Sequence, residues 1–174
     1  MLIAILEDSV FRKGSRDAYN RRWTVRAFAR NAEGKFAFLR IKGTDVLGKR
    51  NHLETIGGGV ENEETLEEAL VREIQEEIGY SCEIEGKIGY VVDHYNALNR
   101  ETISTFFLVK LKDYVGGENL GEEEARLIDS VEYIELDKVV ESLSVYEKRT
   151  INELVQKRDR IAFEYYLKHI DRFK

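Results

Sequence analysis

The sequence predicts an α/β fold in which a mixed β-sheet lies between helices. Segments rich in apolar and β-branched residues occur on both sides of one long amphipathic segment, and the chain ends in a second helical pattern. Strand and helix patterns that alternate within one domain favour a sheet with helices on both faces. A length of 174 residues suits one domain with a proper core. We therefore predict a single domain, residues 1–174, with a helical C-terminal extension from about residue 145 to residue 174.

The first half of the chain is expected to contain four short strands, Leu2–Leu6, Trp23–Ala29, Phe36–Ile41 and Leu53–Ile56. The second and third flank a turn at Asn31–Gly34 and so predict a hairpin. Residues 9–22 are polar and rich in Arg and Lys, which indicates a loop or arm. Lys42–His52 is polar and contains two glycines, and it is interpreted as a second loop.

The second half begins with the amphipathic helix Glu63–Ile78, whose apolar stripe consists of Leu66, Leu70, Ile74 and Ile78, with Val71 at its edge. After it we expect a strand or a hairpin around Gly86 at Cys82–His94, followed by strands at Glu101–Lys112 and Ser130–Leu136. A loop is expected at Tyr114–Glu124, and helices at Asp137–Leu143 and Val145–Ile170. We expect the last helix either to cover one face of the sheet or to form the contact of a homodimer.

The composition is that of an ordinary soluble globular protein, with 43% hydrophobic and 34% charged residues. No apolar run approaches the ~20 residues of a membrane span, and the N-terminus lacks the basic start and cleavage site of a signal peptide. Cys82 is the only cysteine, which excludes an intrachain disulfide or a thiolate zinc cluster. We therefore expect a cytoplasmic protein without a membrane partner.

Charge is distributed unevenly along the chain. Residues 1–50 contain 12 Lys or Arg and 5 Asp or Glu, whereas residues 51–174 contain 15 and 28. A basic segment that faces an acidic one suits an anionic substrate bridged to the protein by a metal, although solvated surface is the simpler explanation for most single charges. The net charge of -6 argues against general nucleic-acid binding.

Residues 57–80 contain the most specific motif of the chain. It opens with a turn of three glycines, Gly57, Gly58 and Gly59. The helix that follows carries Glu73, Glu76 and Glu77 at positions that share one face, where like charges repel each other. A hard divalent cation takes oxygen ligands and would remove this repulsion. The segment therefore predicts a site for a cation such as Mg²⁺.

The same segment resembles the Nudix box: glycine, five residues, glutamate, seven residues, Arg-Glu, an aliphatic residue, any residue, Glu-Glu, any residue, glycine and an aliphatic residue. The matching positions are Gly58, Glu64, Arg72, Glu73, Ile74, Glu76, Glu77 and Gly79. Tyr80 in place of the last aliphatic residue is the one departure. On this resemblance the chain is identified as a member of the Nudix family, similar to its MutT-like members.

The resemblance implies a Nudix-type α/β/α sandwich with a central mixed sheet. It implies that Glu73, Glu76 and Glu77 bind Mg²⁺ or Mn²⁺, that Arg72 orients a glutamate through an ion pair, and that the glycine turn brings backbone close to metal and phosphate. The implied reaction is metal-dependent hydrolysis of the pyrophosphate linkage in a nucleoside diphosphate joined to another moiety X. A bound metal lowers the pKa of water, and a carboxylate can accept the proton.

The identity of the general base stays open at this point. Many relatives use an acidic residue outside the box. Glu132 is favoured because Glu132 and Tyr133 resemble the Glu-aromatic pair of MutT-like members. The alternatives are the loop cluster Glu122, Glu123 and Glu124, or a box glutamate such as Glu76 or Glu73.

Substrate contacts have weaker signals. Arg26, Arg40 and Lys42 could meet phosphates, and Trp23, Tyr90 and Tyr95 could stack on a base. Each also has an ordinary structural interpretation, as solvated surface for the basic residues and as core for the aromatic ones. The substrate contacts taken as candidates are Gly57, Gly58, Gly59, Arg26, Arg40 and Trp23.

The usual markers of a substrate are missing. Ile56 stands where many relatives have proline, and Glu63 stands where many have glycine. The substrate therefore stays open between nucleotide derivatives and nucleoside triphosphates. An alternative function is a Nudix-like module that binds a nucleotide without turnover, but such a module is expected to lose box carboxylates that this chain keeps. An isomerase of isoprenoid diphosphates shares the fold, but Cys82 matches no catalytic position of it.

Overall fold

The computed structural model describes residues 1–12 and 19–173. Its strands are β1 (Leu2–Glu7), β2 (Asn20–Arg30), β3 (Phe36–Asp45), β4 (Gly48–Thr55), β5 (Tyr80–Tyr95), β6 (Arg100–Tyr114) and β7 (Ile128–Ile134). Its α-helices are α1 (Leu66–Ile78), α2 (Glu122–Leu127), α3 (Val139–Ser142) and α4 (Ile151–Lys168). Single 3₁₀ turns are η2 (Asn96–Leu98), η3 (Leu136–Lys138) and η4 (Ile170–Phe173). None of the helices in the described residues is both long and apolar enough to cross a membrane.

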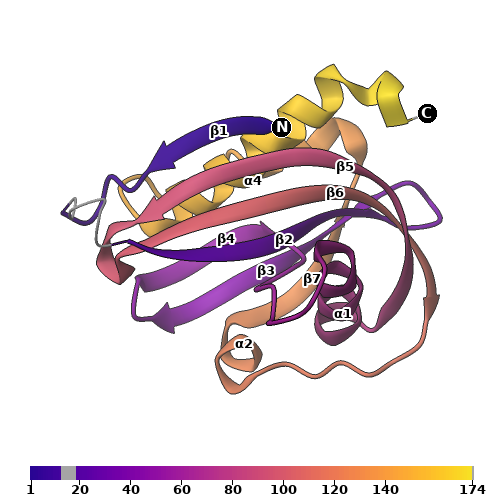
Figure 1. The fold of residues 1–174 in the computed structure, drawn as a ribbon, viewed down its shortest axis with the longest axis horizontal. Helices are drawn as coiled ribbons and strands as arrows, with labels where there is room; N and C mark the ends of the chain where they lie inside the picture. The colour runs from indigo at the N-terminus through magenta and orange to yellow at the C-terminus, as the bar shows by residue number, and fades with distance from the viewer. Residues whose placement is uncertain (13–18, 174) are drawn as a thin grey trace.

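The strands form one mixed sheet between α1 and α4, as Figure 1 shows. The strand order is β1-β5-β6-β2-β3-β4, and β7 pairs with β3. β1 runs parallel to β5 and β2 runs parallel to β6, while the remaining pairs are antiparallel. The predicted α/β/α sandwich with a mixed sheet is confirmed.

The prediction of a loop at Lys42–His52 is wrong. The segment contains the end of β3, the turn and the first part of β4, which together form a hairpin. β3 and β4 pair as far as Asp45 and Gly48. Arg50 forms an ion pair with Asp45 at 2.7 Å, and His52 is fully buried. Polar side chains can be buried in a strand when they have hydrogen-bond or ion-pair partners. Such a strand lacks the alternation of apolar and polar residues by which strands are predicted from sequence.

Other boundaries also differ from the prediction. The expected loop at residues 9–22 ends in β2, and residues 13–18 lie outside the described part of the chain. The expected loop at Tyr114–Glu124 contains the first residues of α2. The expected strand or hairpin at Cys82–His94 is part of the 16-residue strand β5, which is continuous through Gly86.

Helix α1 begins at Leu66 rather than at Glu63 because of its N-terminal cap. Glu63 has a φ of 67°, a left-handed conformation that cannot continue a right-handed helix. The Thr65 hydroxyl accepts a hydrogen bond from the amide of Glu68, and the Glu68 carboxylate accepts one from the amide of Thr65. This capping box satisfies two amides of the first turn. Gly79, with a φ of 72°, ends the helix.

Two apolar cores lie on opposite faces of the sheet. On one face, Leu70 and Ile74 of α1 are fully buried against strands of the sheet. On the other face, Phe163 of α4 contacts Phe28 and Phe36 edge to face, with ring centroids 4.9 and 5.1 Å apart. Burial of such side chains stabilises the fold by about 1.5–3 kcal/mol each. Helix α4 therefore covers the sheet, and a role in a homodimer stays a prediction.

The sheet is split beside the glycine turn. β2 and β3 pair only at Ala29–Ala37 and Arg30–Phe36. Beyond these pairs β3 continues beside β4, so the remaining edge of β2 is open to the segment that follows β4. This segment is the glycine turn.

Candidate active site

Backbone hydrogen bonds hold the glycine turn against β2. The amides of Ala27 and Val25 donate to the carbonyl oxygens of Ile56 and Gly58 at 2.8 and 3.0 Å. Gly57 has a φ of 132°, and a Cβ at this position would lie 2.1 Å from the carbonyl oxygen of Val25. Only glycine fits there, because any side chain would collide with the β2 backbone.

The next two glycines let functional side chains approach the turn. A Cβ on Gly58 would lie 2.6 Å from both carboxylate oxygens of Glu73. A Cβ on Gly59 would lie 2.8 Å from the guanidinium of Arg22. The turn thus brings a carboxylate of α1 and an arginine of β2 to one short stretch of backbone.

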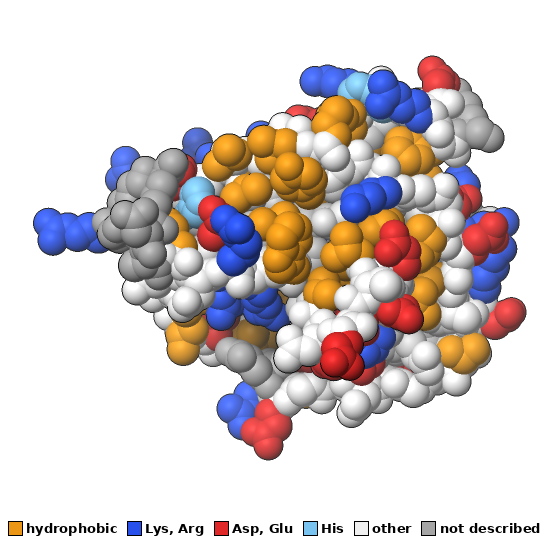
Figure 2. Space-filling view, in the orientation of Figure 1, with side chains coloured by type: hydrophobic (Ala, Val, Ile, Leu, Met, Phe, Trp, Pro, Cys, Tyr) orange, Lys and Arg blue, Asp and Glu red, His pale blue; other side chains and the backbone are white. Residues whose placement is uncertain are grey.

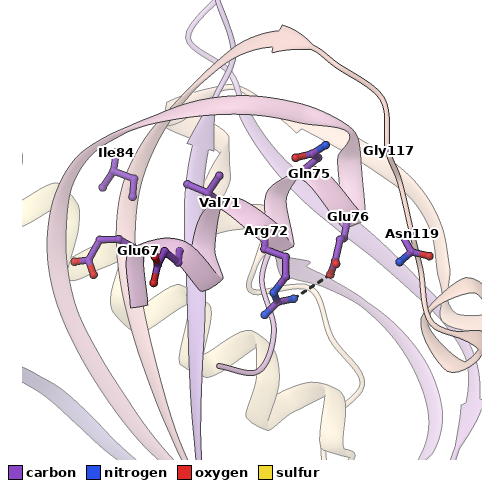
Figure 3. A pocket seen from close by; sticks show the side chains of 9 residues that line it. Glu67, Val71, Arg72, Gln75, Glu76, Ile84, Gly117 and Asn119 are labelled. Carbon is purple, nitrogen blue, oxygen red and sulfur yellow. Dashed lines mark hydrogen bonds and ion pairs between the residues drawn. The ribbon is translucent and has the colours of Figure 1, made fainter. Parts of the chain in front are cut away.

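Arg72 organises the carboxylates around the turn. Its guanidinium donates to Glu64, Glu73 and Glu76, each at 2.9 Å, and to the carbonyl oxygen of Gly59 at 2.9 Å. Figure 3 shows Arg72 and Glu76 on the same side of α1, joined by their ion pair. The hydrogen bond to Glu64 is the largest cause that raises the pKa of Arg72. Arg72 therefore connects the loop before α1, the turn and two box glutamates.

Two box glutamates, the buried Glu73 and the partly buried Glu77, lack full compensation of their charge. Glu73 is 6% exposed, and burial raises its pKa although Arg72 opposes the shift. Burial raises the pKa of Glu77 well above its usual value, although the amide of Gly57 donates to it at 2.7 Å. The charge of Glu73 raises the pKa of Glu77 further. Both carboxylates would gain from a nearby cation.

The donor set fits a hard divalent cation. Glu73, Glu76 and Glu77 supply only oxygen atoms, which Mg²⁺ and Mn²⁺ prefer, and the raised pKa values of Glu73 and Glu77 show uncompensated charge. Within residues 1–12 and 19–173, no three acidic, histidine or cysteine side chains already converge as a metal site. Arg72 holds Glu73 and Glu76, while Gly57 holds Glu77.

Two cavities adjoin the glycine turn. The split cavity, of about 350 Å³, opens between the two parts of the sheet and is lined by Gly57, Gly58, Glu77 and Arg26, among others. The box cavity, of about 420 Å³, is lined by Gly59 and by the box residues Arg72, Glu73 and Glu76. Figure 2 shows Lys and Arg side chains around a hollow above α2, on the side of the split cavity. A larger hollow of about 670 Å³ lies on the outward side of α1, where Figure 3 shows Val71 and Ile84.

The structure separates two predicted residues from the box. Glu132, favoured as general base, and Arg40, expected at a phosphate, pair with each other at 2.7 Å and line neither cavity. The register places Glu132 opposite Phe38, whose side chain lies in the core beneath α4. Residues opposite each other share a face, so Glu132 is on the face away from α1. Only Arg26, of the two predicted arginines, lines the split cavity.

The aromatic candidates also lie outside the two cavities. Trp23 is 49% exposed and aligns with Ile103, Val92 and Ile5 across four strands. Figure 2 shows apolar side chains gathered over this open part of the sheet. Tyr95 is buried against residues of α4. The carbonyl oxygen of Trp23 accepts a hydrogen bond from the amide of Val60 at 3.0 Å, but none of the three predicted aromatic rings lines either cavity.

From the acidic loop cluster, Glu124 of α2 reaches the site. It lines both cavities, and its carboxylate accepts a hydrogen bond from the amide of Gly121 at 2.9 Å. Glu122 points elsewhere, 3.6 Å from Arg126 and almost fully exposed. The side chain of Glu123 lies outside the described part of the structure.

Sequence reasoning missed five charged residues of the split cavity: Arg22, Arg50, Arg100, Asp45 and Glu54. Arg22 could have been found, because it stands four residues before Arg26 on the same side of a strand. Arg100 and Glu54 carry no local signal, because only the pairing of distant strands brings them to the cavity.

Comparisons with known proteins agree with this arrangement. A family model described as NUDIX domain matches residues 20–154. A search of curated proteins finds no match. A NUDIX hydrolase from Nitrosomonas europaea has a similar structure, with a TM-score of 0.64 and 17% identity over 86% of this chain and 90% of that one.

Two further solved structures are also similar. A MutT protein from Methanosarcina mazei Go1 has a TM-score of 0.54 and 21% identity, covering 82% of this chain and 95% of its own. A UDP-X diphosphatase has a TM-score of 0.56 and 20% identity, covering 86% of this chain and 64% of its own. These likenesses concern the fold.

Proposed function

The chain belongs to the Nudix family of pyrophosphohydrolases, and we propose that it uses Mg²⁺ or Mn²⁺ to hydrolyse the pyrophosphate linkage of a nucleotide derivative or a nucleoside triphosphate. The observation that carries this proposal is the pair of incompletely compensated carboxylates at the glycine turn, the buried Glu73 and the partly buried Glu77. The similar UDP-X diphosphatase is named for a linkage of the same kind.

The roles of the box residues follow from their contacts. Glu73, Glu76 and Glu77 would hold the metal, which when bound neutralises a pyrophosphate, acts as a Lewis acid and lowers the pKa of water. Arg72 keeps Glu73 and Glu76 in position through ion pairs of 2.9 Å. Gly57 lets the turn lie against β2, and Gly58 and Gly59 let Glu73 and Arg22 approach its backbone.

We assign the general base to Glu124. It is the acidic residue outside the box that lines both the split cavity and the box cavity. Its side chain is exposed, so a water molecule can reach it, and the amide of Gly121 orients it. A carboxylate in this position can accept the proton of the attacking water.

The test is product release from a panel of nucleoside diphosphate derivatives and nucleoside triphosphates with Mg²⁺ or Mn²⁺. Glu76→Gln should abolish turnover, because it removes a metal ligand. Glu67→Gln is the matched control, since Glu67 lies on α1 but belongs to neither of the two cavities beside the turn. Glu124→Gln should lower kcat about a hundredfold or more with little change in KM.

Two outcomes would overturn the proposal. Turnover that is equal in Glu76→Gln and in the control would exclude the box as the active site. Tight nucleotide binding without turnover of any compound would favour the binding module instead of the enzyme.

A further inference from the structure

Four arginines line the split cavity, and three of them come from the neighbouring strands β2 and β6. Arg22 and Arg26 stand on the same side of β2, and Arg100 begins β6, which runs parallel to β2. The register places Arg100 opposite Asn20 and Thr102 opposite Arg22, so Arg100 and Arg22 are diagonal neighbours. Diagonal neighbours on one face are within reach of long side chains. All three arginines line the cavity.

Two of the cavity's four arginines have their charge matched by the protein. Arg26 pairs with Glu54 at 2.8 Å, and Arg50 pairs with Asp45 at 2.7 Å. Even so, the buried Nε–H groups of Arg26 and Arg50 have no hydrogen-bond acceptor in the described structure. Buried donors without acceptors are unusual, and they point to an acceptor that arrives with a ligand.

The other two arginines, Arg22 and Arg100, have no hydrogen-bond or ion-pair partner for their side chains within residues 1–12 and 19–173. Two uncompensated like charges in one cavity repel each other, and an anion between them would remove this cost. Guanidinium groups suit phosphate, because they donate two parallel hydrogen bonds to it.

Arg22 also connects the split cavity with the metal side of the turn. Its guanidinium lies against Gly59, and it lines both the split cavity and the box cavity. An anion that extends from the box carboxylates into the split cavity would meet Arg22 first and Arg100 beyond it.

The rest of the split cavity is unsuited to a nucleobase. Its uncharged lining side chains are aliphatic, for example Leu39, Ile41, Leu98 and Ile128. Among the described lining residues there is no aromatic ring to stack on a base and no amide or hydroxyl side chain to read its edge.

We propose that Arg22 and Arg100 form a clamp for a phosphate group beyond the diphosphate that faces the metal. This rests on the proposed function for its choice of substrate. The favoured substrates then carry a third phosphate, either as the terminal phosphate of a nucleoside triphosphate or as a phosphate on moiety X, and the base stays outside the cavity. The protein then selects its substrates by the number of their phosphates rather than by their base.

The first experiment measures the binding of inorganic tripolyphosphate and pyrophosphate by calorimetry, in EDTA, so that the arginines act without metal. Tripolyphosphate should bind more tightly than pyrophosphate. Arg22→Gln and Arg100→Gln should each weaken tripolyphosphate binding about tenfold, because each loses charged hydrogen bonds. The matched control is Arg21→Gln, the next residue on β2, which is 63% exposed and pairs with Glu101.

Equal tripolyphosphate affinity in Arg22→Gln, Arg100→Gln and Arg21→Gln would overturn the clamp. Circular dichroism of each variant confirms that it is folded, and Arg22→Lys, which keeps the charge, should retain part of the affinity. Because this experiment needs no turnover, its result is independent of whether the proposed hydrolase activity is found.

The second experiment compares kcat/KM for nucleoside triphosphates with that for nucleoside diphosphate sugars, which lack a third phosphate, and for phosphorylated forms of X. Substrates with a third phosphate should be preferred at least about tenfold, and Arg100→Gln should remove the preference. Comparison of the two kinds of substrate identifies the source of the phosphate. Turnover with no such preference would keep the proposed function and overturn the clamp.

Discussion

Glu54 and Glu77 are partly buried carboxylates that line the same cavity, yet their environments have opposite effects on their pKa values. Burial would raise the pKa of Glu54, but Arg26, His52 and Arg158 together hold it well below its usual value. Burial raises the pKa of Glu77 well above its usual value, because one backbone amide and a more distant Arg26 do not compensate it. The first carboxylate is satisfied by the protein, and the second is available to a cation.

The compensation of Glu54 comes from the C-terminal helix. Arg158 of α4 is 1% exposed and lies 3.2 Å from Glu54 and 2.7 Å from Asp159. Asp159 in turn accepts hydrogen bonds from the amide and hydroxyl of Thr55 at 2.8 and 3.0 Å. The end of β4 is thus fixed by α4 directly before the glycine turn begins. On the side of Glu54, the carboxylates and arginines therefore form a closed ionic network. On the side of Glu77, the carboxylate lacks a cation that would compensate its charge.

The largest effect expected from this contrast is on activity. Glu77→Gln should lower kcat/KM about a thousandfold, because it removes a carboxylate that we propose as a metal ligand, and such a ligand contributes several kcal/mol to the transition state. It should not lower the free energy of unfolding of the metal-free protein, since it removes a partly buried charge that the fold does not compensate. Kinetics with Mg²⁺ and urea unfolding in EDTA measure the two quantities. A loss of stability as large as the loss of activity would show that Glu77 is structural.

The next effect is on stability. Arg158→Met should lower the free energy of unfolding by about 3 kcal/mol, because it leaves Asp159 buried without its cation and removes one of the two arginines that pair with Glu54. Lys157→Met is the matched control on the same helix, since Lys157 is 40% exposed and its ion pair with Glu153 contributes little. Urea unfolding compares them. An equal effect of both variants would contradict the network.

The smallest effect concerns Asp93, which is fully buried 3.9 Å from Arg158. Burial raises its pKa from 3.8 to about 6, although Arg158 opposes the shift. The folded protein therefore binds this proton more tightly than the unfolded chain. The resulting cost to stability is absent below the unfolded value and fully present above pH 6.

Asp93→Asn should accordingly raise the free energy of unfolding by on the order of 2 kcal/mol at pH 7.5 and by much less near pH 4. Thermal and urea unfolding of both proteins across this range measure the difference. A gain that does not depend on pH would mean that Asp93 is already ionised without cost.

The box could be predicted from the sequence because its geometry is local. Helical periodicity alone places Glu73, Glu76 and Glu77 within one turn of each other, and Thr65 with Glu68 forms the capping box that a Thr followed by Glu three residues later suggests. The expected start of α1 at Glu63 overlooked this signal, which marks Thr65 as the N-cap. Glu63 adopts a φ of 67°, which the surrounding structure imposes on a residue other than glycine.

The position of Glu132 away from the box and the unexpected hairpin have a common cause. Glu132 belongs to a strand as predicted, but the register of β7 on β3 decides which face it occupies. A shift of one residue would turn it to the opposite face, and no local pattern of polar residues fixes that register. In the segment Lys42–His52, burial of Arg50 and His52 depends on partners supplied by the fold.

The sequence by itself determined the family, the acidic helix with its glycine turn, and the number and approximate places of the strands. These depend on spacing along the chain and on the alternation of apolar residues. Only the tertiary structure decided that Arg22 and Arg100 meet in one cavity, that α4 supplies the counter-charge of Glu54, and that Glu124 rather than Glu132 lies beside the box. Such contacts join residues far apart in the chain, so they follow from strand order, register and burial rather than from any local motif.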